Sequence, residues 1–263
     1  MHMKFRPCID IHNGQVKQIV GGSLRDQGDQ ALENFVSERD AAYYARFYQK
    51  DGLSGGHIIL LNHKESPYYE ATRRQAELAL KACPGDFQVG GGITKDNALE
   101  YLRMGASHVI VTSYVFREGK IQEENLKAIS RIVGREHLVL DLSCRRKEDG
   151  YYIVTDRWQN FTDVKVSPET LDELAAYCDE FLIHAADVEG RAQGIEYDLV
   201  DMLGCWEGIP VTYAGGVGNF DHLEQLYILG QNRLDVTIGS ALDLFGGSMD
   251  YNRVLDFCEA SRE

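Results

Sequence analysis

Two segments in opposite halves of this 263-residue chain follow the same pattern, and this repeat limits the fold more than any other feature. In the first half, the apolar segment 87–93 ends in a glycine turn and is followed by a helical segment and a second apolar run, 107–113. In the second half, 211–217 and 234–240 repeat this order of strand, glycine turn, helix, strand and small hydroxyl turn. Such turns present backbone N–H groups at a helix N-terminus, which favours phosphate. The repeat therefore predicts two phosphate-binding sites.

The duplication also includes one aspartate on the first strand of each half. Asp10 interrupts the apolar segment 7–11, and Asp141 interrupts the apolar segment 139–142. Equivalent positions in the two halves are about 130 residues apart, far more than the repeat length of a solenoid. The chain is therefore expected to contain two duplicated half-domains that close on each other.

Composition sets the class of protein and excludes several partners. With 44% hydrophobic and 26% charged residues and no linker between the halves, the chain is expected to form one globular domain over residues 1–263. A net charge of −14 argues against binding to nucleic acid or to an anionic membrane, and no apolar segment is long enough to span a bilayer. No signal-peptide pattern precedes the first strand, and the scattered cysteines form no CxxC pair. We therefore expect free thiols in a reducing compartment.

Periodicity predicts eight strands separated by helical segments. The strand segments are mostly continuous apolar runs, as expected for parallel strands covered on both faces: 5–11, 57–62, 87–90, 108–112, 137–142, 180–185, 210–214 and 234–238. Predicted helix N-caps are Ser37, Thr94, Ser167 and Asn219. Eight alternations predict an α/β fold of the (β/α)₈ TIM-barrel type, built from two half-barrels. An open doubly wound sheet explains the alternation equally well, but not the return of the pattern after half the chain.

Two connections, 12–36 and 143–166, are longer than a barrel requires, and each follows an aspartate strand. Long irregular loops in compact domains are frequently functional, so both are expected to act as paired lids. The second contains the segment 151–155, which is expected to pair as part of a hairpin, followed by Trp158.

The two aspartates are the first candidates for catalysis. Asp10 and Asp141 fall near the carboxyl ends of strands one and five, where barrel enzymes carry their active sites. These strands are opposite each other in a ring of eight, which suits an acid and a base on opposite faces of one substrate. For either aspartate alone, capping a loop or pairing with a lysine such as Lys17 would be the simpler explanation. A repeat-related pair on otherwise apolar strands favours catalysis.

The turns at the strand ends supply the candidate phosphate ligands. The first predicted site consists of Gly90, Gly91, Gly92, Thr112 and Ser113, and the second of Gly215, Gly216, Gly239 and Ser240. Strand six ends in three further ionisable residues, His184, Asp187 and Glu189, for which participation and simple solvation are equally compatible with the pattern. Arg145, Arg146 and Lys147 would favour a substrate anion, although such charge runs are usually only solvated.

These motifs together resemble one family over essentially the whole chain. The segments that carry the resemblance are 7–14, 88–93, 109–113, 139–145, 181–190, 213–216 and 239–243. They are similar to those of the ProFAR isomerases of histidine biosynthesis, particularly the eukaryotic branch. The resemblance implies a duplicated half-barrel that binds a substrate with two phosphates. It also implies an Amadori rearrangement of an aminoaldose to an aminoketose, without a metal or organic cofactor.

The resemblance also assigns roles to residues. It implies that Asp10 is the general base and Asp141 the general acid, with exchange of the two roles left open. At strand six the chain departs from the bacterial pattern, because it has His184 and the turn Glu189-Gly190-Arg191 where bacterial relatives have threonine and an Asp-Gly-Thr turn. This leaves open whether Asp187 or Glu189 shares the acid role. We include Asp187 among the catalytic residues, and His184 and Gly190 among the substrate-binding ones. We expect a cytoplasmic monomer, or a plastid protein if the source is a plant.

Two alternatives remain at this level. The cyclase of imidazole glycerol phosphate synthase is also a duplicated barrel with opposed aspartates, but it needs ammonia from a glutaminase partner. The hairpin-like insertion that ends at Trp158 fits the isomerase better. A non-catalytic phosphosugar-binding barrel is the other alternative. It is disfavoured because two idle acids beside a bisphosphate would weaken binding.

Overall fold

A ring of eight parallel strands forms the centre of the protein, in a computed structural model that describes residues 2–19, 23, 31–156 and 158–261. The strands, in ring order, are β1 (Cys8–His12), β4 (Gly56–Leu60), β5 (Phe87–Gly90), β6 (His108–Val111), β9 (Leu138–Asp141), β13 (Glu180–His184), β14 (Val211–Ala214) and β15 (Asp235–Thr237). A parallel bridge between Phe5 and Val236 closes the ring. The Val236 carbonyl accepts from Arg6 N at 2.8 Å, and Val236 N donates to the Lys4 carbonyl at 2.9 Å. The predicted barrel is confirmed, and each predicted strand segment overlaps one strand of the ring.

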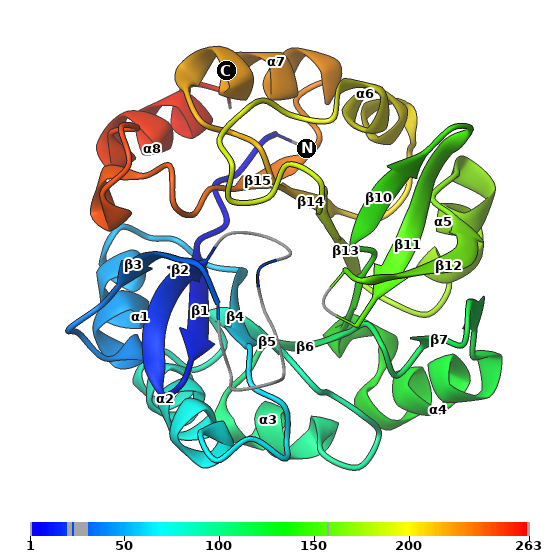
Figure 1. Ribbon diagram of the computed structural model, residues 1–263, viewed down its shortest axis with the longest axis horizontal. Helices are drawn as coiled ribbons and strands as arrows, with labels where there is room; N and C mark the ends of the chain where they lie inside the picture. Colours follow the sequence, from blue (N-terminus) through cyan, green and yellow to red (C-terminus); the bar gives the residue numbers. More distant parts are fainter. Residues whose placement is uncertain (1, 20–22, 24–30, 157, 262–263) are drawn as a thin grey trace.

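Helices surround the ring on its outer side (Figure 1). The α-helices of the described residues are α1 (Ala41–Lys50), α2 (Tyr69–Ala82), α3 (Ala98–Met104), α4 (Glu123–Val133), α5 (Pro168–Ala175), α6 (Tyr197–Cys205), α7 (Phe220–Leu229) and α8 (Tyr251–Ala260). Two 3₁₀ turns, η1 (Arg135–His137) and η2 (Asp243–Phe245), complete the helical elements. The main apolar core lies between strands and helices, and a small second cluster of Ile110, Val139 and Leu182 fills part of the barrel interior. Both faces of the strands are therefore apolar, which explains their continuous apolar runs.

The helix starts agree with prediction at two of four positions. Ser167 and Asn219 are the N-caps of α5 and α7, as predicted. The predictions for Ser37 and Thr94 are wrong, because the caps of α1 and α3 are Asp40 and Asn97. The Ser37 hydroxyl instead accepts from Arg39 N at 2.8 Å and from the Tyr44 hydroxyl at 2.9 Å. This tertiary contact removes Ser37 from the capping role.

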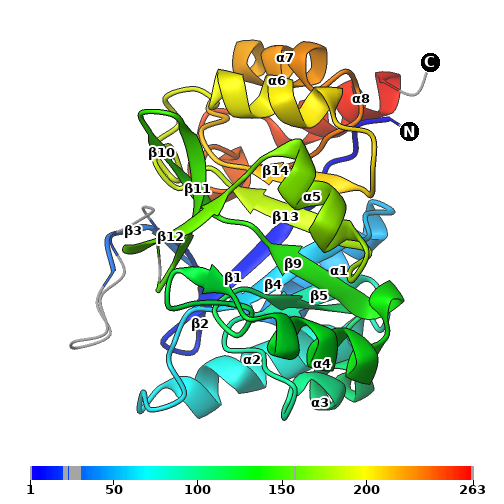
Figure 2. The same cartoon turned by 90° about the vertical axis from the view of Figure 1, so that its right-hand side faces the viewer.

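The two long connections form small antiparallel sheets. The first contributes β2 (Gln15–Ile19) and β3 (Glu33–Val36), which extend β1, whereas residues 20–22 and 24–30 of this predicted lid lie outside the described residues. The second forms a three-stranded sheet of β10 (Cys144–Lys147), β11 (Gly150–Thr155) and β12 (Asn160–Lys165), so the hairpin predicted at 151–155 is confirmed and extended. A short pair, β7 (Phe116–Arg117) and β8 (Lys120–Ile121), follows β6. Figure 2 shows β3 and β10–β12 at one end of the barrel and both termini at the other.

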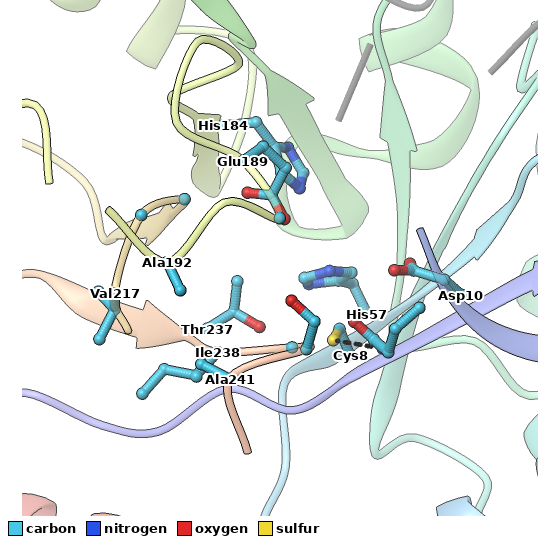
Figure 3. A pocket seen from close by; sticks show the side chains of 16 residues that line it. Cys8, Asp10, His57, His184, Glu189, Ala192, Val217, Thr237, Ile238 and Ala241 are labelled. Atoms are coloured by element: carbon cyan, nitrogen blue, oxygen red, sulfur yellow. Dashed lines mark hydrogen bonds between the residues drawn. The ribbon is translucent and has the colours of Figure 1, made fainter. Parts of the chain in front are cut away.

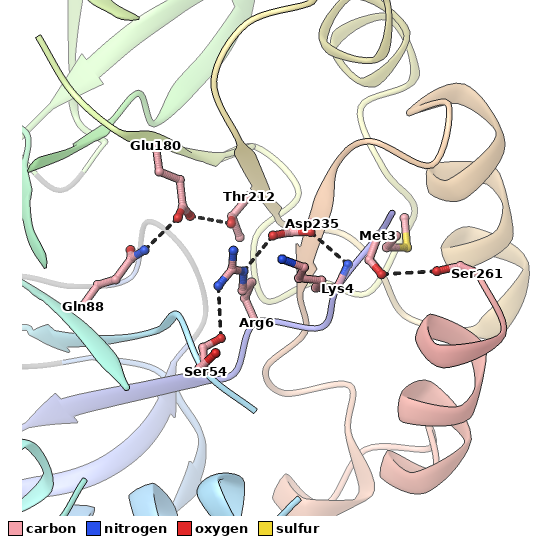
Figure 4. A network of polar contacts seen from close by, with 9 residues as sticks. All are labelled: Met3, Lys4, Arg6, Ser54, Gln88, Glu180, Thr212, Asp235 and Ser261. Atoms are coloured by element: carbon pink, nitrogen blue, oxygen red, sulfur yellow. Dashed lines mark hydrogen bonds and ion pairs between the residues drawn. The ribbon is translucent and has the colours of Figure 1, made fainter. Parts of the chain in front are cut away.

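A buried polar network fills the barrel interior near the termini (Figure 4). Arg6 Nε contacts Asp235 Oδ2 at 2.7 Å, and Asp235 Oδ1 accepts from Lys4 N at 2.9 Å. The Glu180 carboxylate accepts from Gln88 Nε2 at 2.8 Å and from the Thr212 hydroxyl at 2.7 Å. This end is a packed interior, as in other barrels of this type, and ligands are expected at the opposite end.

The cysteines and the lengths of the helices agree with what composition predicts. The six cysteines are unpaired, and all except Cys205 are buried. Among the described residues, no helix has both the length and the apolar character that crossing a bilayer requires.

Candidate active site

Asp10 and Asp141 line the same cavity at the carboxyl end of the barrel. Asp10 is the third residue of β1 and Asp141 the last of β9, and three strands separate β1 from β9 in each direction around the ring. The cavity has a volume of about 390 Å³ and is open to solvent. The structure thus brings the two aspartates to one space from opposite walls.

A second cavity, of about 40 Å³, adjoins the first, and the two share three lining residues: Asp10, His184 and Glu189. Figure 3 shows how these side chains lie. His184 and Glu189 extend from one wall, and Asp10 extends from the β1 side toward His57. The shared residues therefore lie where the two cavities meet.

The predicted phosphate ligands divide between the two cavities. The larger cavity is lined by Gly90, Gly91, Gly92, Thr112 and Ser113, and the smaller by Gly190, Gly215, Gly216, Gly239 and Ser240. Within the described chain, no backbone carbonyl accepts a hydrogen bond from the N–H groups of Gly92, Ile93, Ser240 or Ala241. Each cavity therefore offers N–H donors to an anion. This arrangement suits phosphate without a net positive surface.

Left-handed backbone explains why glycine occupies both turns. Gly91 and Gly92 follow β5 with φ of 103° and 70°, and Gly215 and Gly216 follow β14 with φ of 117° and 78°. A Cβ atom on Gly91 would lie 2.2 Å from the Leu60 carbonyl oxygen. The strand ends thus align Gly91 with Gly215 and Gly92 with Gly216, so the two turns are equivalent in conformation as well as in sequence.

Asp141 is held by hydrogen-bond donors. Its Oδ1 accepts from Ser143 N at 2.8 Å, from the Ser143 hydroxyl at 2.7 Å and from His184 Nδ1 at 3.5 Å. Burial alone would raise the pKa of Asp141, but the His184 charge and the Ser143 hydrogen bonds outweigh it and lower that pKa. Asp141 is therefore a carboxylate at neutral pH.

Asp10 and Glu189 have the opposite tendency. Burial, reinforced by the nearby Glu189 carboxylate and partly opposed by His184, raises the pKa of Asp10 to about 7. Burial also raises the pKa of Glu189, whose Oε2 has no hydrogen-bond partner among the described residues. The cavity therefore contains carboxyl groups whose pKa values are separated by their surroundings, an arrangement typical of acid-base sites.

Two histidines that line the smaller cavity also differ in charge. Burial would lower the pKa of His184, but the carboxylates of Asp141, Glu189 and Asp10 together raise it to about 9. Burial and the His184 charge lower the pKa of His57 to about 3. At neutral pH, His184 is an imidazolium and His57 is neutral.

Asp187 does not line either cavity, although it was expected to be catalytic. Its Oδ1 contacts Arg145 Nε at 2.7 Å, and its Oδ2 accepts from Arg146 N at 3.0 Å. Two residues further along the same loop, Glu189 lines both cavities. The charge run on β10 is also directed elsewhere, since Lys147 Nζ lies 4.3 Å from the centre of the Tyr152 ring.

The sequence patterns do not identify several of the lining residues. Gln18, His57 and Thr237 line the smaller cavity, and Lys64 lines the larger one. The signal available for His57 was a polar residue on an otherwise apolar strand. Trp158, in the insertion after β9, lies with its ring centre 5.8 Å from that of His184. Among the described residues, no cluster of His, Cys, Asp and Glu is arranged to hold a metal ion.

Comparison with known proteins shows which family the chain is similar to. Residues 4–249 match the family described as histidine biosynthesis protein. The chain is 53% identical over 257 residues to the chloroplastic 1-(5-phosphoribosyl)-5-((5-phosphoribosylamino)methylideneamino)imidazole-4-carboxamide isomerase of Medicago truncatula, covering 96% of this chain and 81% of that protein. It is 47% identical to the isomerase of the same name from Yarrowia lipolytica, covering 93% of each chain. The Saccharomyces cerevisiae isomerase is 42% identical, covering 94% of each chain.

Proposed function

The chain belongs to the histidine biosynthesis protein family and within it to the ProFAR isomerases, and from this membership we propose how its cavity residues divide the work of the reaction. It is an aldose–ketose isomerase, and membership in this branch selects the isomerase over the cyclase and the non-catalytic barrel. The proposal concerns the placement of ProFAR in the two cavities and the roles of three carboxyl groups.

The two phosphates of ProFAR are proposed to occupy the two glycine turns. One phosphate binds at the turns after β5 and β6, and the other at the turns after β14 and β15. The observation that carries this placement is that Asp10, His184 and Glu189 line both cavities. A substrate held at both ends therefore has its reacting ribose beside these side chains.

Asp10 is proposed as the general base that removes the C2 proton, and Asp141 as the general acid that protonates the ribose ring oxygen. With its pKa raised to about 7, Asp10 is a stronger base than an ordinary carboxylate and is substantially ionised at neutral pH. Asp141 faces the same cavity from β9, the strand opposite β1 in the barrel. Exchange of the two roles is the alternative assignment. Glu189, instead of Asp187, is the carboxyl group of the β13–α6 loop proposed to share the acid role.

The direct test is isomerisation of ProFAR by the Asp10→Asn variant. Loss of a general base is expected to lower kcat by about 10²- to 10⁴-fold, with a smaller change in KM because the phosphate turns remain intact. Near wild-type turnover by the folded variant would remove Asp10 from the mechanism. Comparing Glu189→Gln with Asp187→Asn then decides the loop carboxylate: the first is expected to impair kcat strongly and the second by less than about 10-fold.

The quaternary structure, cofactor and compartment remain predictions. We expect a monomer, which light scattering on the purified protein would show. We expect full turnover after dialysis against a chelator, because no step of the proposed reaction uses a metal. The chloroplastic name of the Medicago truncatula relative describes that protein, and for this chain we retain the cytoplasmic expectation unless the source is a plant.

A further inference from the structure

His184 occupies a position that binding of the phosphates does not explain. Its side chain is only 13% exposed, and Nδ1 lies 3.5 Å from Asp141 Oδ1. The Trp158 ring lies on one side, with ring centres 5.8 Å apart, and the His57 ring meets it edge-on at 5.9 Å. The imidazole is therefore fixed in orientation, with one nitrogen directed at a proposed catalytic carboxylate.

The titratable groups around His184 come from four parts of the barrel. Asp141 faces it from β9, Glu189 from the loop after β13, Asp10 from β1 and His57 from β4. Three of these are carboxyl groups, and the fourth, His57, is neutral because burial and the His184 charge lower its pKa to about 3. The surroundings therefore keep the proton on His184.

This arrangement creates a requirement for the proposed reaction. Asp141 accepts hydrogen bonds from Ser143 N, the Ser143 hydroxyl and His184, so the resting enzyme holds it as a carboxylate. A carboxylate has no proton to give to the ribose ring oxygen. The His184 imidazolium contacts Asp141 and carries a proton that it can transfer at neutral pH.

We propose that His184 is a positioning residue that acts through Asp141, delivering to it the proton that opens the ribose ring. This inference rests on the proposed function, in which Asp141 is the acid. The proton passes from His184 Nδ1 to Asp141 Oδ1 and then to the ring oxygen. As the C1–O bond breaks, its electron pair stays on the oxygen, and the lone pair of the nitrogen bonded to C1 forms a C1=N double bond. His184 is left neutral and Asp141 is again a carboxylate.

The remaining steps restore both groups. Asp10 removes the C2 proton, the electron pair of the C2–H bond forms the C1–C2 double bond of the enolamine, and the π electrons of the C1=N bond return to the nitrogen. As the ketose forms, C1 accepts a proton from Asp10, and the C2 hydroxyl returns its proton through Asp141 to His184. No oxidant, reductant or further reactant is needed, since every proton that is donated is recovered.

The test is the pH dependence of kcat/KM for ProFAR in the wild-type enzyme and in His184→Asn. Because His184 must be protonated, wild-type activity is expected to fall as pH rises past about 9. In His184→Asn this decline is expected to disappear from that range, and kcat to fall about 10²-fold, the lower end of what a general acid contributes. The matched control is His108→Asn, which removes another histidine–aspartate contact, 3.3 Å to Asp179, at the opposite end of a barrel strand. It should retain the wild-type profile.

The possible results separate this inference from the proposed function. If His184→Asn keeps the decline near pH 9 and turns over within about threefold of wild type, the inference is overturned. If Asp10→Asn is inactive at the same time, the proposed function stands without it. If the decline is instead lost in Glu189→Gln and kept in His184→Asn, Glu189 supplies the proton and the inference is again overturned.

A second measurement does not depend on the folding of a His184 variant. Histidine ¹⁵N chemical shifts of the wild-type enzyme are expected to show His184 as a cation up to about pH 9. In Asp141→Asn its titration should move to lower pH, because the strongest partner charge is lost. A neutral His184 at pH 7.5 in the wild-type enzyme would overturn the inference.

Discussion

Gly92 and Gly216 allow a test of the glycine turns after β5 and β14, where the two phosphates are proposed to bind. The two glycines share a backbone conformation but differ in the atoms packed around them. Both have left-handed backbone, with φ of 70° and 78°, so alanine at either position costs about 1–2 kcal/mol in backbone strain. A Cβ atom on Gly92 would have no atom within 4 Å. A Cβ atom on Gly216 would lie 1.9 Å from the Gly194 carbonyl oxygen and 3.0 Å from Val188 Cγ2.

Because of these surroundings, the alanine variants of Gly92 and Gly216 are expected to differ in their free energy of unfolding. Gly92→Ala is expected to lower the free energy of unfolding by about 1–2 kcal/mol, the backbone strain alone. Gly216→Ala must also displace the 188–194 loop, at about 1–3 kcal/mol for overpacking, and lose the 2.9 Å hydrogen bond from Gly194 N to Gly216 O, at about 1 kcal/mol. Its total loss is therefore about 3–6 kcal/mol.

Urea unfolding followed by circular dichroism measures the difference, and steady-state kinetics shows its consequence for the site. The methyl group of Gly92→Ala lies at the wall of the larger cavity, so we expect KM for ProFAR to rise about 10-fold in a protein of nearly wild-type stability. Equal stability losses in the two variants would refute the difference in packing around Gly92 and Gly216. An unchanged KM in Gly92→Ala would refute the placement of a phosphate at that turn.

Two further predictions concern the charges of the barrel. Replacing Glu189 by Gln removes a carboxylate that raises the pKa of Asp10. The acidic limb of the kcat/KM profile, expected near pH 7 in the wild type, should therefore move to lower pH in this variant. If the limb does not move, Asp10 is not the base that titrates there. Asp235→Ala breaks the Arg6–Asp235 ion pair beside the Phe5–Val236 closure of the ring and should lower the free energy of unfolding by about 3–5 kcal/mol. Glu207→Ala, which breaks the exposed Arg233–Glu207 pair, is the control and should cost about 0–1 kcal/mol, and similar losses in both would contradict the importance of the buried pair.

The barrel strands could be predicted from the sequence because burial on both faces leaves an unbroken apolar run. Segment 87–90 coincides with β5, and segment 137–142 extends beyond β9 (Leu138–Asp141) by one residue at each end. Hydrophobicity does not specify these end positions, since hydrogen bonds to the neighbouring strands determine where a strand stops. The repeat then selected the closed ring over an open sheet.

The strands of the insertions were harder to predict. β10 consists of Cys144–Lys147, three of whose four residues are basic, and it is a strand because β11 pairs with it in antiparallel register. β2 (Gln15–Ile19) likewise depends on pairing with β1 and β3. Pairing partners of this kind are tertiary information. Only the apolar middle strand, β11, carried a local signal.

The direction in which the side chains of a loop point is equally difficult to predict from the sequence. Asp187 and Glu189 lie two residues apart in one acidic turn, and both were plausible acids. The structure separates them because Arg145, on the neighbouring insertion sheet, pairs with Asp187 and draws it away from the cavities. No spacing rule contains this contact, which depends on how β10 lies against the β13–α6 loop.

The net charge of −14 and the bisphosphate substrate become compatible once the cavity charges are considered. In the proposed placement, the glycine turns bind the phosphates through neutral N–H groups, so the site needs no added cations that would weaken the negative charge of the carboxylates. The phosphates would then be the nearest additional negative charges to Asp10, Glu189 and His184. Such charges raise the pKa of every one of these groups further. A bound substrate would thus favour the protonated forms of His184 and Glu189, which donate protons, and would make the ionised fraction of Asp10 a stronger base. On this reasoning, the charge that makes the substrate difficult to bind also prepares the surrounding groups for proton transfer.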